Sequence, residues 1–157
     1  MSTVVKSVSA ATTRAAKPVG VAYLMGRVDH AFKRLMREQL KDLDLTVSQY
    51  TALSFLADEK SMSNARLAEL AMISPQSAHE MVLLMEAKGW ITRQPDNVDH
   101  RVIQIALSAQ GRDLLSQGDR RVRAIEKDML EGMHDEGLTA LKQNLRLFLD
   151  NIKAQQN

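Results

Sequence analysis

The stretch that decides the fold runs from Ser63 to Leu107 and changes its pattern three times. It begins SNARLAELAMI (63–73), continues SPQSAHEMVLLMEAKG (74–89), and then reads WITRQ (90–94), PDNVDH (95–100) and RVIQIAL (101–107). The first two segments place apolar residues at helical spacing, whereas the last ones alternate on either side of a polar, turn-rich tip. This order predicts a helix, a tight turn, a second helix and a two-stranded hairpin, which is a helix-turn-helix followed by a wing.

The ends of the two predicted helices are marked by residues that suit them. Ser63 and Ser74 can each accept a hydrogen bond from an unpaired N–H in the first turn of a helix. Pro75 stands at a first helical position and Gly89 just past the end, where a left-handed residue is needed. The core-facing positions of the second helix are predicted to be Ala78, Met81, Val82 and Met85. The outward-facing positions of its first turns, which a helix-turn-helix presents to the major groove, are Gln76, Ser77, His79 and Glu80.

The wing and its flanks resemble those of the MarR (multiple antibiotic resistance regulator) family. The segment DHRVIQIALS (99–108) is similar to the family's wing signature, which is Asp-x-Arg followed by an aliphatic-x-Leu-Thr ending, with Ser108 in place of the threonine. MEAKGWITR (85–93) resembles the link from recognition helix to wing, and SAQG (108–111) resembles the opening of the next helix. The match extends in order and spacing from about Gly20 to the C-terminus. It implies a mainly α fold with a small antiparallel β wing, that is, a winged helix-turn-helix plus a helical dimerisation region.

Long amphipathic helices are predicted on both sides of the winged unit. Apolar residues recur at helical spacing through 20–40, Thr46 and Gln49 form a capping box, and Ser108 caps a further helix. Gly132 and Gly137 bracket a break before a last helix over 138–152. The stripes carry more apolar surface than one small DNA-binding unit needs. By resemblance, 20–45 and 108–157 form the dimerisation region and 46–107 the winged helix-turn-helix.

The first nineteen residues are predicted to be a flexible tail. They hold Lys6, Arg14 and Lys17 and no acidic residue, so a basic arm that touches DNA phosphate or packs on a partner subunit is the alternative.

Composition narrows the class of protein further. A chain of 157 residues with 45% apolar content is expected to form one domain or one subunit of a small assembly. No apolar run approaches the ~20 residues of a membrane span, and no secretory signal is recognisable, so we expect a cytoplasmic protein. The net charge of +2 barely favours nucleic acid. The absence of cysteine excludes disulfides, and it also excludes the family's thiol-oxidation mode for this chain.

An enzyme is not expected. The four histidines show no paired metal spacing, and neither a nucleophile motif nor a phosphate-cradling glycine loop occurs. We therefore predict no cofactor and no metal. Two alternatives remain open: a winged-helix dimer that acts by protein interaction, with DNA binding weakened or lost, and metal sensing through His134, Asp135 and Glu136.

The predicted DNA-binding residues lie on the second helix, on the helix before it and in the wing. They are Arg66, Ser74, Gln76, Ser77, His79, Arg93, Asp99 and Arg101. Amide and imidazole side chains can contact base edges, and the serines can add hydroxyl contacts. By resemblance, Arg101 enters the minor groove, where arginine responds to narrow A·T-rich geometry. Asp99 orients the wing, either by holding Arg101 or Arg93 or by closing the turn.

Glu80 departs from the family pattern, because many members have a basic or neutral polar residue there. Three readings stay open. The carboxylate can accept from a cytosine amino group, it can pair with Arg66 and face away, or it can face phosphate and weaken binding. From 61 to 87 the only fixed cation is Arg66.

The resemblance also implies how the regulator acts. A two-fold homodimer would place two recognition helices about one turn of DNA apart, ~34 Å, and favour a palindromic site. The family generally responds to small aromatic or amphipathic anions bound between the dimer helices and the winged unit, so we expect a repressor released by such a ligand. The residues predicted to line that cleft are Tyr23, His30, Arg34, Tyr50 and Ser54.

Overall fold

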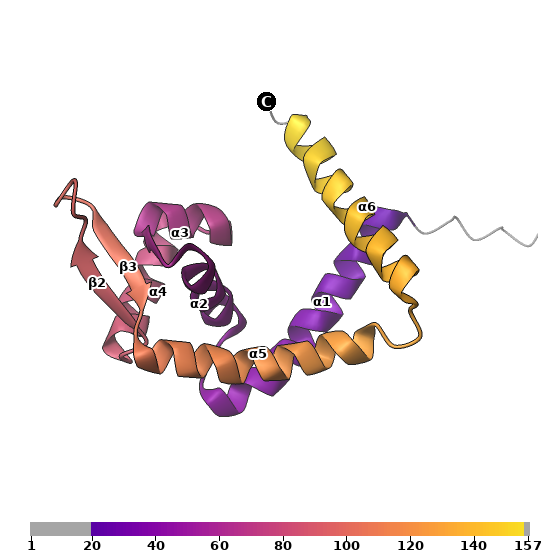
Figure 1. Cartoon of the computed structure of the whole chain (residues 1–157), viewed down its shortest axis with the longest axis horizontal. Coiled ribbons are helices and arrows are strands. Elements are labelled where there is room, and N and C mark those ends of the chain that lie inside the picture. The colour runs from indigo at the N-terminus through magenta and orange to yellow at the C-terminus, as the bar shows by residue number, and fades with distance from the viewer. Residues whose placement is uncertain (1–19, 156–157) are drawn as a thin grey trace, which may run out of the picture.

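The structure is a computed structural model that describes residues 20–155 (Figure 1). The predictions for residues 1–19, a tail or a basic arm, lie outside the described residues. In chain order the elements are α1 (Val21–Leu40), η1 (Lys41–Leu43), α2 (Val47–Glu59), β1 (Ser61–Ser63), α3 (Asn64–Ala71), α4 (Pro75–Ala87), β2 (Ile91–Pro95), β3 (Ile103–Leu107), α5 (Ala109–Met129) and α6 (Asp135–Ala154). Figure 1 shows a winged unit from α2 to β3 and, on the other side of the molecule, the N-terminal part of α1 crossed by α6. The long helix α5 runs beneath and joins the two.

The predicted fold class is confirmed: a mainly helical chain with a small antiparallel sheet. The predicted hairpin is the β2–β3 pair, with Ile91 opposite Leu107 and Arg93 opposite Ile105. The sheet has three strands, however, in the order β1-β3-β2. No strand was predicted near Ser61, because a strand of three residues is too short to show an alternating pattern. That strand is defined by its pairing with β3, in which Ser61 lies opposite Ala106.

The helix starts form where the capping residues predicted them. The Ser63, Ser74 and Ser108 hydroxyls accept from the backbone N–H groups three residues later, at 3.2, 3.0 and 2.9 Å. Thr46 and Gln49 exchange the two hydrogen bonds of a capping box. Gly89 has a φ of +73°, as expected of a residue that ends a helix in the left-handed region.

The last break differs slightly from its prediction. Gly132, with a φ of +85°, lies in the turn, but Gly137 lies inside α6, which begins at Asp135. Asp135 and Glu136 occupy the first turn of α6, where negative charge suits the positive end of the helix dipole. The helix therefore starts three residues earlier than the apolar stripe alone indicated.

A close approach of two segments fixes the start of α5 against the root of the wing. The Ser108 backbone N–H donates to the Trp90 carbonyl at 3.0 Å, and the Ser108 hydroxyl donates to the Gly89 carbonyl at 2.6 Å. A Cβ at Gly111 would overlap that same Trp90 carbonyl oxygen. Glycine is needed at position 111 because a backbone group occupies the space of a side chain.

The buried core lies in the winged unit and along its contact with α1 and α5. Its largest fully buried side chains include Leu40, Leu53, Leu56, Leu67 and Met85. In contrast, α6 has no buried residue, and α1 has only Met36 and Leu40, both near its C-terminal end. Within residues 20–155 no helix combines the length and apolar character of a membrane span.

Candidate nucleic-acid interface

Helix α4 presents the face that the sequence predicted. Ser74 caps it, Pro75 occupies its first turn, and Ala78, Val82 and Met85 are buried against the core. The outward positions are all exposed, namely Gln76, Ser77, His79 and Glu80. The first turns of this helix are therefore free to meet a partner, and the N-terminal positive end of its dipole suits an anion such as phosphate.

Two side chains on that face are joined. Gln76 Nε2 donates to Glu80 Oε1 at 2.9 Å, one helical turn away. The sequence left open that Glu80 pairs with Arg66. The two side chains do not contact each other. Arg66 binds Glu59 at 2.9 Å and Glu69 at 3.0 Å, and these two acids raise the pKa of its guanidinium.

The serines at the start of α4 are also hydrogen-bonded to each other. The Ser74 hydroxyl donates to the Ser77 hydroxyl at 2.9 Å while it accepts from the Ser77 backbone N–H. The Ser77 hydroxyl keeps its own proton free for a contact outside the protein. No hydrogen bond of the His79 side chain occurs within residues 20–155, where that side chain is exposed.

In the wing, Asp99 holds the Arg101 side chain through two hydrogen bonds. Asp99 Oδ1 accepts from Arg101 Nε at 3.0 Å, and Asp99 Oδ2 accepts from Arg101 Nη2 at 3.1 Å. These bonds lower the pKa of Asp99 below its usual value. Arg101 is still 91% exposed, so the guanidinium is oriented but not buried.

The partner of Arg93 is on the recognition helix instead. Arg93 NH1 lies 3.0 Å from Glu86 Oε2, so this cation ties the root of the wing to the C-terminal end of α4. Of the three roles open to Asp99, the geometry therefore matches two: its carboxylate orients the Arg101 side chain and also closes the turn by accepting from the Arg101 backbone N–H at 3.1 Å.

Asp96 is a wing residue that the sequence reasoning missed. Its Oδ1 accepts from the backbone N–H groups of Val98 and Asp99 at 2.8 and 3.1 Å, and its Oδ2 accepts from Gln104. The two backbone bonds are the main reason that the pKa of Asp96 lies below its usual value. The signal was present, since an aspartate directly after proline is a common turn former. Glu80 is the other residue not chosen as a site residue, although its spacing from Gln76 is that of neighbours on one helix face.

The structure divides the five residues predicted to bind an effector. Tyr23, His30 and Arg34 lie together along an exposed groove of about 490 Å³ on α1. Tyr50 is elsewhere, and its hydroxyl donates to Asp119 of α5 at 2.9 Å. Burial and then this hydrogen bond raise the pKa of Tyr50 to about 12. The Ser54 hydroxyl donates to the Tyr50 carbonyl of its own helix, also at 2.9 Å.

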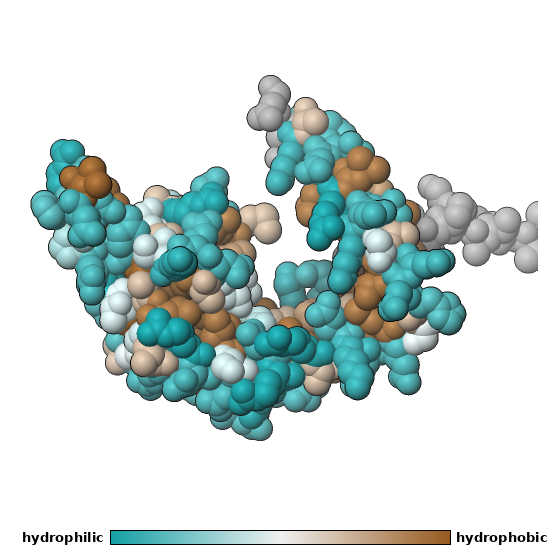
Figure 2. Space-filling view, viewed as in Figure 1, coloured by the Kyte–Doolittle hydropathy of each residue, from teal (hydrophilic) through white to brown (hydrophobic). Residues whose placement is uncertain are grey.

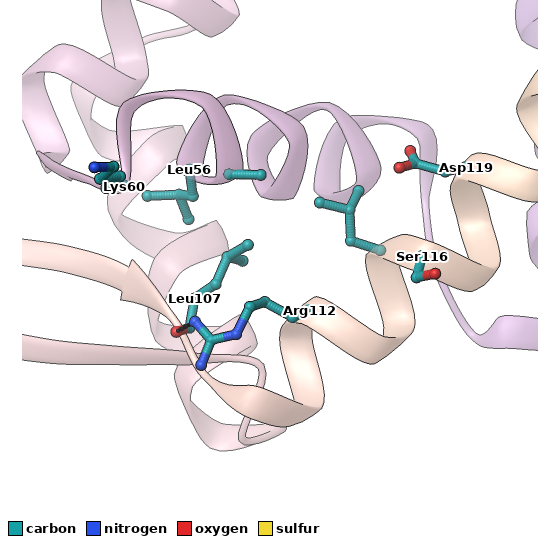
Figure 3. Close-up of a pocket in the computed structure, with 8 residues that line it drawn as sticks. Leu56, Lys60, Leu107, Arg112, Ser116 and Asp119 are labelled. Carbon is teal, nitrogen blue, oxygen red and sulfur yellow. Dashed lines mark hydrogen bonds between the residues drawn. The ribbon is translucent and has the colours of Figure 1, made fainter.

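A further cavity of about 330 Å³ lies between α2, the end of β3 and α5 (Figure 3). Lys60 and Arg112 lie toward one end, Ser116 and Asp119 lie toward the other, and leucines form the wall between them. Arg112 NH1 donates to the Leu107 carbonyl at 2.9 Å, so this guanidinium is anchored to the last residue of β3.

His134, Asp135 and Glu136 do not form a metal centre. Within residues 20–155, no group of three His, Asp or Glu side chains has an arrangement that could hold a metal ion. The three residues are consecutive at the start of α6, where adjacent side chains point in different directions around the helix.

A capped recognition helix with an exposed face, beside a hairpin with an oriented arginine, defines a winged-helix DNA-binding protein. Comparison with known proteins agrees with this class. The model of the MarR family matches residues 45–103, which span α2 to the first residue of β3. The HTH-type transcriptional repressor Rv2887 of Mycobacterium tuberculosis is 28% identical over 113 residues, which is 72% of this chain and 80% of that protein. The HTH-type transcriptional regulator TtmR of Methylorubrum extorquens is 28% identical over 126 residues, 80% of this chain and 64% of that one.

Solved structures share the fold over most of the chain. Wild-type MarR from Escherichia coli aligns with a TM-score of 0.75 and 20% identity over 85% of this chain and 99% of that one. A mutant of that protein complexed with operator DNA aligns with a TM-score of 0.72 and 21% identity over 82% of this chain and 92% of that one. BpsR from Bordetella bronchiseptica, whose DNA binding is regulated by 6-hydroxynicotinic acid, aligns with a TM-score of 0.73 and 20% identity over 83% of this chain and 94% of that one.

Over residues 45–103 the chain matches the MarR family, and its winged-helix fold and curated relatives place it among DNA-binding transcriptional regulators.

Proposed function

We propose that this regulator is a repressor that binds a palindromic DNA site as a homodimer and is released by a small aromatic or amphipathic anion. The observation that carries the proposal is a DNA-binding unit with its recognition face exposed, linked by α5 to a pair of helices whose apolar side chains have little to pack against. A transcriptional regulator works where the chromosome is, so the proposal includes a cytoplasmic location.

The unpartnered apolar surface supports the dimer. Apolar side chains gather on the lobe made by α1 and α6 (Figure 2). A groove of about 500 Å³ opens between α1, the end of α5 and α6. It is lined almost entirely by apolar residues, among them Val21, Leu24, Met25, Val28, Phe32, Met129, Leu141 and Leu145. Apolar surface of this extent is typical of an interface, and we assign 20–45 and 108–157 to dimerisation and 46–107 to DNA binding.

The direction of regulation is inferred from a relative. The Mycobacterium tuberculosis relative is named a repressor. If α4 and the wing of each subunit engage one half-site, the two-fold symmetry of the dimer matches a palindrome. In this proposal Ser74, Ser77 and Arg93 position the unit, Gln76 and His79 contact bases, and Arg101 enters the minor groove.

An effector would act through the junction between the dimer helices and the winged unit. Tyr23, His30 and Arg34 combine an aromatic ring with cationic or titratable groups, which suits an aromatic carboxylate. The regulation of BpsR by 6-hydroxynicotinic acid is consistent with such a ligand class. Because a ligand can shift only an equilibrium between states that it binds unequally, it must prefer the dimer that does not bind DNA.

A second candidate function is protein interaction with DNA binding weakened. The charge of α4 and its surroundings favours it, since Glu80 is exposed and Arg66 is neutralised by two acids. Selection of bound sequences from random duplex DNA, followed by affinity measurements against salt concentration, separates the two. The regulator should enrich an A·T-rich palindrome with half-sites about one turn apart, and its affinity should fall steeply with salt. Failure to enrich any sequence at low salt, without ligand, would support the protein-interaction function instead.

A further inference from the structure

We propose that Glu80, held in position by Gln76, selects a cytosine in the major groove of each half-site. This inference rests on the proposed function, because it needs α4 to enter the major groove. It assigns a specificity role to a residue that otherwise only weakens the attraction to DNA.

The first step is the direction of the bond between the two side chains. A carboxylate can only accept, so the 2.9 Å contact from Gln76 to Glu80 requires that the amide NH2 points toward the acid. The amide oxygen of Gln76 then points away from Glu80. The pair therefore offers two hydrogen-bond acceptors from one helix face: Gln76 Oε1 and the second carboxylate oxygen, Glu80 Oε2.

The second step is that the charge of Glu80 is not cancelled by the protein. The three cations nearest to Glu80 along the chain all pair with other acids: Lys88 with Asp44, Arg93 with Glu86, and Arg66 with Glu59 and Glu69. No ion pair among residues 20–155 includes Glu80. An exposed carboxylate in the first turns of a recognition helix repels phosphate on every duplex, so it reduces affinity unless it gains a specific contact.

The third step is the chemistry of the major groove. Guanine presents only acceptors there, and thymine presents an acceptor and a methyl group, so neither can satisfy the pair. Cytosine and adenine each present an amino group. In adenine that group lies beside the N7 acceptor, which repels a carboxylate, whereas in cytosine it lies beside a C–H group. Acceptance from cytosine N4 is thus the contact that a glutamate favours.

Glu80 therefore contributes to specificity in two ways: it binds cytosine, and it weakens binding to DNA sites that lack cytosine at that position. Repulsion between carboxylate and phosphate lowers the affinity for every site. Only at a site with a cytosine at the right position does a hydrogen bond offset that loss. Specificity obtained in this way comes from penalising the wrong partners. We expect the choice of cytosine over the other bases at that position to be about tenfold in affinity, toward the lower end of the range for one well-placed base contact.

The experiment compares wild type with Glu80→Gln, since glutamine has nearly the same shape and can both donate and accept. Both full-length proteins are used to select binding sequences from random duplex DNA. Asp58→Asn is the matched control, because it removes one exposed negative charge from α2, which carries none of the proposed DNA contacts. A second duplex carries N4-methylcytosine at the selected position, where the methyl group replaces the groove-facing proton and base pairing is retained.

Wild type should enrich cytosine at one position in each half-site and should bind the N4-methylcytosine duplex about tenfold more weakly. Glu80→Gln should lose most of that discrimination and bind unrelated duplexes more tightly, whereas Asp58→Asn should behave as wild type. If Glu80→Gln tightens binding to all duplexes by one factor and keeps the same base preferences, the cytosine contact is refuted. If wild type enriches no sequence at all, the proposed function itself fails.

Discussion

At the tip of the wing, one arginine is exposed and yet held in a defined orientation. Asp99 fixes Arg101 through two hydrogen bonds, and Asp96 fixes the turn that carries Asp99. An oriented side chain loses less entropy when it binds, so the two aspartates suit Arg101 to the DNA contact that we propose for it. Neither carboxylate is itself suited to contact phosphate.

Arg101→Ala should lower affinity for the selected site by about 1–2 kcal/mol and reduce the salt dependence by about one counterion. The fold should be unaffected, because the side chain has no partner other than Asp99 within the described residues. Fluorescence anisotropy at several salt concentrations measures both quantities. Lys127→Ala, on α5, serves as a control for the loss of one positive charge. Equal affinity of wild type and Arg101→Ala would contradict the minor-groove role.

Met72 shows how a single backbone conformation costs stability. It ends α3 with a φ of +52°, in the left-handed region, and its side chain is 92% exposed. For a non-glycine residue this conformation is less stable by roughly 1–2 kcal/mol.

Met72→Gly should therefore raise the free energy of unfolding by about 0.5–1 kcal/mol, since the greater freedom of glycine in the unfolded chain offsets part of the relief. Urea denaturation measures the change. Met72→Ala keeps the Cβ and should show no such gain, so an equal gain in both variants would rule out backbone strain as the cause.

At the scale of the elements, α5 is joined to the winged unit at two places. At its start, Gly111 lies against the Trp90 carbonyl. Further along, Tyr50 of α2 lies against Gly118 and donates to Asp119. Any rearrangement of the winged unit relative to α5 must disturb at least one of these contacts.

Gly111→Ala should reduce the free energy of unfolding by about 1–3 kcal/mol or more, because the added methyl group forces apart two backbone segments. Gln110→Ala, in the same turn and exposed, should change it by less than about 0.5 kcal/mol. Thermal and urea unfolding followed by circular dichroism test the pair. Equal stabilities of Gly111→Ala and wild type would mean that the two segments separate without cost.

Tyr50 makes stability sensitive to high pH. Its pKa is raised to about 12 in the folded state from an ordinary value of 10.0, so the folded protein holds the phenolic proton more tightly than the unfolded chain does. The stabilisation is fully present below pH 10 and is lost as the pH rises from 10 toward 12.

Between these pH values the free energy of unfolding should fall more steeply for wild type than for Tyr50→Phe, which has no phenol to titrate. All other ionisable groups are the same in both proteins, so the difference between the two curves, measured by urea denaturation, is the quantity of interest. Parallel curves would contradict the raised pKa.

At the scale of the whole molecule, α6 is a helix of twenty residues with no buried residue. A helix whose stability comes mainly from packing of its apolar face needs a partner for that face. The winged unit has its core within the chain, whereas the lobe of α1 and α6 requires a second copy in our proposal.

Leu149→Asp on α6 should weaken the dimer tenfold or more, on the order of a central interface residue, and leave the winged unit folded. Leu149 is 56% exposed in the single chain, so an intramolecular core is not disrupted. Leu83→Asp on α4 introduces the same change outside the proposed interface and should leave the dimer intact. Sedimentation velocity over a range of concentrations reports the association, and an unchanged dimer in Leu149→Asp would place the interface elsewhere.

The amino-acid sequence by itself determined the features that depend on neighbours within about four residues. The caps at Ser63, Ser74 and Ser108, the left-handed Gly89 and the buried stripe of α4 all follow from local hydrogen bonding and helical period. The order of helices and hairpin followed as well, because period 3.6 and period 2 are both visible in the sequence. The hydrogen bond between Gln76 and Glu80 is also a local feature, because the two residues lie one helical turn apart.

Only the tertiary structure decided the relations between residues distant in the chain. Strand β1 exists because β3 offers it free backbone groups, and Gly111 is required because Trp90 lies against it. Tyr50 could not be separated from a predicted ligand cleft until Asp119, 69 residues away, was seen to bind its hydroxyl. Arg66 does not pair with Glu80 because it forms ion pairs with Glu59 and Glu69 instead. Pairings of this kind depend on how the elements pack, and no periodicity of the chain records that packing.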